Sequence, residues 1–272
     1  VADGEVGGSL GADPIGVHAR TGTPRDLAPA AELAARVAAR YPLLRTVVAD
    51  GLPFHEAGGS DAQELGATIA AGVAYLRALV DAGLDVETAA GQLEFRLAAT
   101  ADQFLTIAKL RAARRLWARV AEVSGVTGPG AAMRQHAVTS PAMVTRRDPW
   151  VNMLRTTIAG FAAGAGGADA VTVLPFDEAL GRPEELSLRL ARNTQAILLD
   201  ETRLAGVVDP AGGSWYVEKL TDELAHAAWR EFTAVEKAGG VVAELTSGAL
   251  AERLAETRRA RADRIATRHD PI

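Results

Sequence analysis

The sequence predicts an α/β protein whose strands are parallel and whose connections are long helices. Short β-branched runs alternate with amphipathic patterns along the 272 residues, and each run is followed by a long helical pattern. No low-complexity linker interrupts this rhythm. Such alternation is typical of right-handed βαβ units around one parallel sheet. We therefore expect a single domain over residues 1–272.

The first half contains two predicted strands and three predicted helices. In chain order they are the helix 28–40, the strand 43–49, the helix 61–80, the strand 92–98 and the helix 101–123. The second of these helices carries apolar residues at spacings of three and four, which indicates one buried face. Ser60 or Asp61 is placed to cap it, and Gly83 to end it.

The second half repeats the pattern. Its predicted elements are the strand 131–139, the helix 149–163, the strand 170–174, the helix 184–201, the strand 204–208 and the helices 217–237 and 243–267. Asp148 is the expected N-cap of the first helix, followed by a proline at its first position. Five βα units fit either an open doubly wound sheet or part of a (β/α)₈ barrel. Eight barrel units usually take about 250 residues. Because the predicted helices here are long, the 272 residues hold only five units, three fewer than a closed barrel.

Composition excludes several classes of function. The formal charge is −5, so no nucleic-acid surface is indicated. With no cysteine, disulfides and thiolate metal sites are excluded, which suits the cytoplasm. No apolar run approaches the ~20 residues that cross a bilayer. The chain begins without methionine on an acidic, glycine-rich stretch and ends without an obvious terminal element, so we expect a fragment.

Two motifs offer both a structural and a functional interpretation. The stretch Asp209–Ser214 follows a predicted strand and precedes a helix, so it is either a tight turn, which we favour, or an anion-binding loop. Arg134 and His136 share one face of the predicted strand 131–139. At a strand's carboxyl end they would suit an anionic acyl-CoA, but pairing with internal carboxylates explains them equally well. The five histidines show no metal-binding spacing.

Five ordered stretches resemble the cobalamin-dependent acyl-CoA mutases, specifically the methylmalonyl-CoA mutase family. The order and spacing hold over about residues 43–240. The matching stretches are Ile107-Ala-Lys-Leu-Arg-Ala-Ala-Arg-Arg-Leu-Trp117, Asp148-Pro-Trp-Val-Asn-Met-Leu-Arg-Thr-Thr157, Pro175-Phe-Asp-Glu-Ala179, Ala191-Arg-Asn-Thr-Gln195 and Asp209-Pro-Ala-Gly-Gly-Ser-Trp-Tyr216.

This resemblance implies a fold and a chemistry. The family interconverts methylmalonyl-CoA and succinyl-CoA by a radical 1,2-shift that adenosylcobalamin starts. An N-terminal (β/α)₈ barrel threads the acyl-CoA, and a separate flavodoxin-like domain holds the cobalamin. The chain would then be the later part of the barrel, with about five strands. Bacterial members often pair a catalytic large subunit with a small subunit that has lost the chemistry.

The departures from the family pattern indicate the small subunit. Catalytic members carry Tyr-His just before Met-Gln-Glu-Ala-Gly, and the histidine hydrogen-bonds the thioester carbonyl. Aligning Glu56-Ala57-Gly58 places Leu52 at the tyrosine, Pro53 at the histidine and His55 at the glutamine. Proline has no side-chain donor, so that role is lost and no catalytic residue is assigned to this chain.

Other family positions survive only in part. Of the catalytic pattern Arg-Thr-His-Cys-Gln-Thr-Ser-Gly-Trp, this chain keeps Arg134, His136, Thr139 and Ser140, the candidates for acyl-CoA binding. The resemblance also makes Asn193 and Gln195 candidates for facing the cofactor. The cobalamin-ligating Asp-x-His-x-x-Gly string is absent, so we expect adenosylcobalamin in the holoenzyme but none bound by this chain alone.

Three hypotheses follow. In the first, the chain is part of a small subunit that supports a catalytic large subunit. In the second, it belongs to a competent mutase for a neighbouring substrate such as isobutyryl-CoA, with His136 or His55 in a relocated role. In the third, it retains an acyl-CoA site that uses Arg134 and Ser140 without chemistry. Because a partial barrel leaves strand edges open, we also expect association or further chain that completes the sheet.

Overall fold

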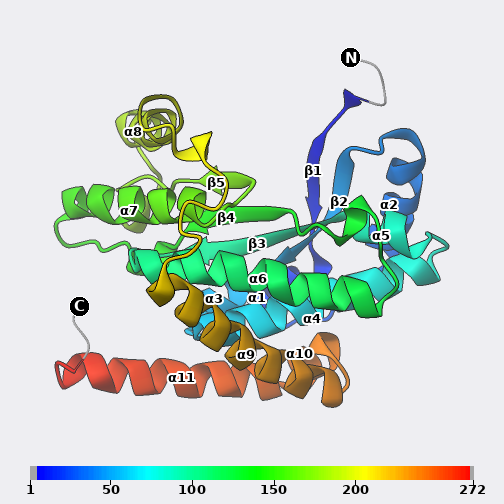
Figure 1. The fold of residues 1–272 in the computed structure, drawn as a ribbon. Helices are drawn as coiled ribbons and strands as arrows, with labels where there is room; N and C mark the ends of the chain where they lie inside the picture. The colour runs from blue at the N-terminus through cyan, green and yellow to red at the C-terminus, as the bar shows by residue number, and fades with distance from the viewer. Residues whose placement is uncertain (1–4, 270–272) are drawn as a thin grey trace. The chain divides into compact units, whose positions relative to one another are not determined.

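The computed structural model describes residues 5–269 and confirms the α/β class (Figure 1). Its five strands form one sheet in the order β1-β2-β3-β4-β5, so each strand lies beside its neighbour in sequence. The strands are β1 (Gly8–Ala12), β2 (Leu44–Asp50), β3 (Leu93–Ala99), β4 (Gln135–Thr139) and β5 (Ala170–Thr172). The pairs β1–β2 and β4–β5 are parallel. Parallel neighbours joined through helices fit successive units of a (β/α)₈ barrel.

The chain divides into two compact units, which are described separately below. The first unit comprises residues 1–95, 116–133 and 226–272, and the second comprises residues 96–115 and 134–225. Three elements contribute residues to both units: β3, α6 (Gln103–Val123) and α9 (Trp215–Lys237).

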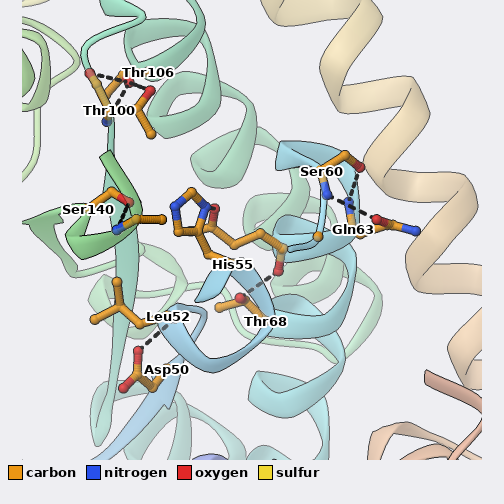
Figure 2. Close-up of polar contacts among 12 residues, drawn as sticks. Asp50, Leu52, His55, Ser60, Gln63, Thr68, Thr100, Thr106 and Ser140 are labelled. Atoms are coloured by element: carbon orange, nitrogen blue, oxygen red, sulfur yellow. Dashed lines mark hydrogen bonds and ion pairs between the residues drawn. The ribbon is translucent and has the colours of Figure 1, made fainter. Parts of the chain in front are cut away.

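The first unit contains the strands β1 and β2 together with several complete helices. The helices are α1 (Pro14–Thr21), α2 (Ala28–Arg40), α3 (Leu52–Glu56), α4 (Asp61–Asp81), α5 (Val86–Gly91), α10 (Val241–Ser247) and α11 (Ala249–Ala266). The start of α4 confirms the predicted cap: the Ser60 hydroxyl accepts from the Gln63 amide, and the Gln63 side chain accepts from the Ser60 amide (Figure 2). This reciprocal pair satisfies two N–H groups that a helix end otherwise leaves unpaired.

The core of the first unit centres on an aromatic pair. The rings of Phe95 and Trp117 lie 4.5 Å apart between centroids, and both residues are buried. Gly72 of α4 leaves room for them, because a Cβ at this position would lie 2.6 Å from the Phe95 ring. This buried glycine therefore sets how closely α4 approaches the aromatic pair.

The second unit contains the complete helices α7 (Asn152–Ala165) and α8 (Glu185–Ala196) and several short turns. The turns are η3 (Pro141–Met143), η4 (Pro149–Val151), η5 (Glu178–Leu180), the π-helical η6 (Ile197–Glu201) and η7 (Leu204–Gly206). Ile107, Ala162, Ala165 and Val217 form a buried apolar cluster, with Leu204 and Ala211 packed against it.

The structure corrects several sequence-based boundaries. The predicted strand 204–208 is wrong: it forms the turn η7, and Val208 is 97% exposed. The fifth strand is instead β1, whose glycine-rich sequence gave no β-branched signal. The predicted strand 131–139 begins only at Gln135.

Two helix predictions also change. Asp148 does not cap a helix, because its backbone is left-handed (φ 49°) and α7 starts after the turn η4. The predicted helix 243–267 is two helices, α10 and α11, since Gly248 adopts φ 81° and ends the first of them.

Candidate functional site

In the first unit, the position of the lost Tyr-His pair is a buried, locally hydrogen-bonded turn. Leu52 and Pro53 open the short helix α3, directly after the carboxyl end of β2. The carboxylate of Asp50, 1% exposed, accepts a 2.9 Å hydrogen bond from the Leu52 amide through Oδ1 (Figure 2). Its Oδ2 accepts from Arg20 at 2.7 Å. The turn thus presents an aliphatic side chain and a proline, neither of which donates a hydrogen bond from its side chain.

His55, the nearest histidine in sequence, already faces a carboxylate. Its Nδ1 lies 3.3 Å from Oε2 of Glu64, and both residues are buried. Glu64 belongs to the first turn of α4, so the packing of α3 against α4 brings the two side chains together. His55 therefore has a structural partner within the first unit.

A second buried carboxylate, Asp13, follows the carboxyl end of β1. Its Oδ1 accepts from the Tyr75 hydroxyl at 2.7 Å and from the Gly16 amide at 2.8 Å. Burial removes water from this carboxyl and raises its pKa to about 6, because desolvation disfavours the charged form more than these hydrogen bonds favour it. Arg20 lies 3.9 Å from Asp13 and also pairs with Asp50, so one cation serves both carboxylates.

Sequence reasoning assigned no site role to Asp13, Arg20, Asp50, Glu64 or Tyr75. Asp50 follows a predicted strand, and an acidic residue at a strand's carboxyl end is a signal that could have found it. Asp13 was hidden because β1 was not predicted. Nothing in the local sequence links Tyr75, in the middle of α4, to Asp13.

In the second unit, Arg134 and His136 lie near the amino end of β4. Arg134 precedes the strand, so it does not lie at the carboxyl end that would suit an anionic acyl-CoA. Its guanidinium pairs with Asp169 at 2.9 Å. His136 is the second residue of β4, and its Nε2 lies 2.8 Å from the hydroxyl of Thr172 in β5. Both side chains therefore contact groups within the second unit.

Thr139 and Ser140 are fully buried at the carboxyl end of β4, and their hydroxyls accept backbone hydrogen bonds. The Thr139 hydroxyl accepts from the Leu174 amide at 2.8 Å, and the Ser140 hydroxyl accepts from the Ala142 amide at 3.1 Å. These side chains hold the turns after β4 and β5 in place.

Asn193 and Gln195 belong to the last part of α8 and differ in their surroundings. Asn193 is exposed, whereas Gln195 is half-buried and lines a small pocket. The structure therefore places the two residues in different environments, although they are only two positions apart.

The loop Asp209–Gly213 is held by Arg111 of α6. The five N–H groups of Arg111 donate to both carboxylate oxygens of Asp209, both of Glu218 and the hydroxyl of Thr221, at 2.8–3.2 Å. The Gly213 amide also donates to Glu218 at 3.0 Å. The geometry therefore favours the structural interpretation of this loop, as a turn locked by a side chain, over an anion-binding loop.

The histidine and carboxylate side chains of the described range do not gather into a metal-binding group. Among residues 5–269, no cluster of three or more histidine, cysteine, aspartate or glutamate side chains is arranged to hold a metal. The Asp-x-His-x-x-Gly string is absent from the sequence, and His55 and His136 already contact Glu64 and Thr172. The chain therefore lacks the histidine-bearing string that the family uses for the lower ligand of a cobalamin. In the same described range, no helix has the length and hydropathy to cross a bilayer.

The parallel strands, each joined to the next through helices, define a barrel-type α/β protein. A family model described as methylmalonyl-CoA mutase matches residues 5–272. The chain belongs to the methylmalonyl-CoA mutase family.

Named relatives give the same result. The chain is 65% identical to the methylmalonyl-CoA mutase small subunit of Streptomyces virginiae, covering 100% of this chain and 44% of that protein. It is 46% identical to the small subunit of Propionibacterium freudenreichii subsp. shermanii, over 97% of this chain and 42% of the relative. The large subunit of Porphyromonas gingivalis is 40% identical over 58% of this chain and 22% of its own length. The chain thus spans less than half the length of the small subunits it matches.

Proposed function

We propose that this chain is the barrel portion of a methylmalonyl-CoA mutase small subunit that supports a catalytic large subunit without performing the isomerisation. The carrying observation is the turn at Leu52 and Pro53, which Asp50 holds by its bond to the Leu52 amide. The resemblance requires a histidine donor at the second position, and proline supplies none. The identity to small subunits, higher than to the large subunit, supports the same assignment.

The proposed holoenzyme uses adenosylcobalamin, which supplies the radical when bound. Because this chain lacks the Asp-x-His-x-x-Gly string, we assign cobalamin binding to other parts of the holoenzyme. The cytoplasm is the proposed location, since the chain has no cysteine and its substrate class is metabolic.

Activity measurements on the gene product that contains this chain test the proposal. With adenosylcobalamin and methylmalonyl-CoA, it is expected to form no succinyl-CoA alone and to support turnover once its large subunit is added. In that assembly, Leu52→Ala should leave kcat unchanged, whereas replacing the large subunit's reactive histidine should abolish turnover. Succinyl-CoA formation by the isolated subunit would contradict the proposal.

The acyl-CoA contacts assigned to Arg134, His136, Thr139 and Ser140 remain predictions, as does the cofactor-facing role of Asn193 and Gln195. Calorimetry with a CoA thioester tests the first group. If Arg134 binds the ligand, Arg134→Met will weaken binding. If Arg134 serves only to pair with Asp169, Arg134→Met will lower the stability of the protein and leave the affinity for the CoA thioester unchanged.

A further inference from the structure

The second unit contains a pocket of about 150 Å³ whose walls are mostly apolar. It lies among α7, the start of β5, the end of α8 and the turns η6 and η7. The residues that define its chemistry are Gly160, Gly164, Gln195, Leu198, Leu199 and Leu204. None of the positions assigned to acyl-CoA binding lines this pocket.

Two glycines one helical turn apart leave room for the pocket. A Cβ at Gly164 would overlap the Leu204 side chain, and one at Gly160 would lie 3.1 Å from Val173 and 3.6 Å from Leu198. Leu198 and Leu199 come from the π-helical turn η6. Single π-helical turns are rare and occur frequently at functional sites. The space thus depends on an unusual backbone and on the absence of side chains at two positions.

The pocket has two polar side chains, of which one is already used. Asp169 accepts from the Arg134 guanidinium through Oδ1 and from the Gln135 amide through Oδ2, at 2.9 and 2.8 Å. Within residues 5–269, the side-chain amide of Gln195 makes no hydrogen bond. A half-buried amide with a free donor and a free acceptor is suited to a neutral polar group.

We propose that this pocket binds a small neutral molecule with a short hydrocarbon chain and one amide or hydroxyl group, which pairs with Gln195. An apolar cavity of about 150 Å³ accepts benzene, so the ligand has about six or seven non-hydrogen atoms. No lysine or arginine lines the pocket, and Asp169 disfavours an anion, so a carboxylate would lose its hydration without compensation. The site does not rest on the proposed subunit role, and it gives Gln195 a ligand other than the cofactor that the family resemblance suggests for this residue.

Titration with pentanamide, followed by the methyl NMR signals of Leu198, Leu199 and Leu204, tests this site. Pentanamide should shift these signals in a saturable manner, and pentanoate at pH 7 should bind at least about tenfold more weakly. Gln195→Leu should weaken pentanamide binding by about fivefold, the effect of one lost hydrogen bond. Asn193→Leu, on the same helix but outside the pocket, should leave it unchanged.

Other results would overturn the proposal. Unchanged methyl signals at millimolar pentanamide would show that the pocket does not bind this class of molecule. Equal binding of pentanoate would contradict the preference for neutral ligands. Equal affinity of wild type and Gln195→Leu, with folding confirmed by their NMR spectra, would remove Gln195 from the site.

Discussion

The Tyr75 hydroxyl donates a 2.7 Å hydrogen bond to Oδ1 of Asp13 and accepts a 2.8 Å bond from the Ile15 amide. One side chain from the middle of α4 thereby fixes both the carboxylate that caps α1 and the first turn of that helix. The bond joins residues 62 positions apart, so it stabilises tertiary structure as well as a helix end.

The contribution of Asp13 to stability should increase as the pH falls through the range in which this carboxyl titrates. Its pKa is about 6 in the folded protein and 3.8 as its ordinary value, so between these values the folded state binds more protons than the unfolded state. The free energy of unfolding contributed by Asp13 then decreases as the pH rises, by up to about 3 kcal/mol. Asp13→Asn removes this dependence, and urea unfolding of both proteins between pH 4.5 and 7.5 measures the difference. A constant difference across this range would contradict the prediction.

Tyr75→Phe should destabilise the protein by about 1–3 kcal/mol, because it leaves the Ile15 amide buried without its acceptor. Thermal or urea unfolding measures the loss. The aromatic ring remains, so packing is nearly unchanged. If the variant is as stable as wild type, the hydroxyl is not needed at the start of α1.

Gly72→Ala should cost about 1–3 kcal/mol by overpacking, because the added Cβ meets the Phe95 ring at 2.6 Å and Trp117 at 3.0 Å. Gly91→Ala is the matched control, since a Cβ at Gly91 meets no atom within 4 Å. Gly72 lies inside α4 and Gly91 at the end of α5, so the helix-propensity gain from alanine is larger at position 72 and opposes the expected loss. Comparison of the two unfolding midpoints isolates the steric effect, and equal midpoints would exclude it.

Arg111→Lys should loosen the Asp209–Gly213 loop, because an ammonium group cannot reproduce two bidentate carboxylate contacts. Hydrogen exchange of the Gly213 amide should become faster. Arg115→Lys is the control: Arg115 pairs with Asp222 on the surface, where both side chains are about half exposed, and such pairs contribute little. Equal exchange rates in the two variants would contradict the role of Arg111.

Sequence patterns predicted the elements whose signals are local. The predicted helix 28–40 coincides with α2, and the cap at Ser60 is present in α4. By contrast, β1 was missed because Gly8 and Gly11 provide no side chains for a strand pattern, and its identity depends on pairing with β2. The run 204–208 has apolar residues but forms no strand.

The sequence predicted the candidate site only where this chain departs from the family pattern by losing a side-chain hydrogen-bond donor. Leu52 and Pro53 could be assigned from the sequence because neither side chain donates a hydrogen bond. The cluster of Asp13, Arg20 and Tyr75 could not, since its partners come from separate elements. Likewise, the pairing of Arg134 with Asp169 depends on where β4 begins, a boundary that periodicity places poorly.

The saturated guanidinium of Arg111 also restricts how this region can evolve. Every N–H group of Arg111 donates to an oxygen of Asp209, Glu218 or Thr221. Loss of Asp209 or Glu218 therefore leaves two of these N–H groups without their acceptor. Substitutions at 111, 209 and 218 should consequently be non-additive, since each changes the value of the other two. The loop is expected to persist through divergence as one inherited unit, with its three charged positions retained or lost together.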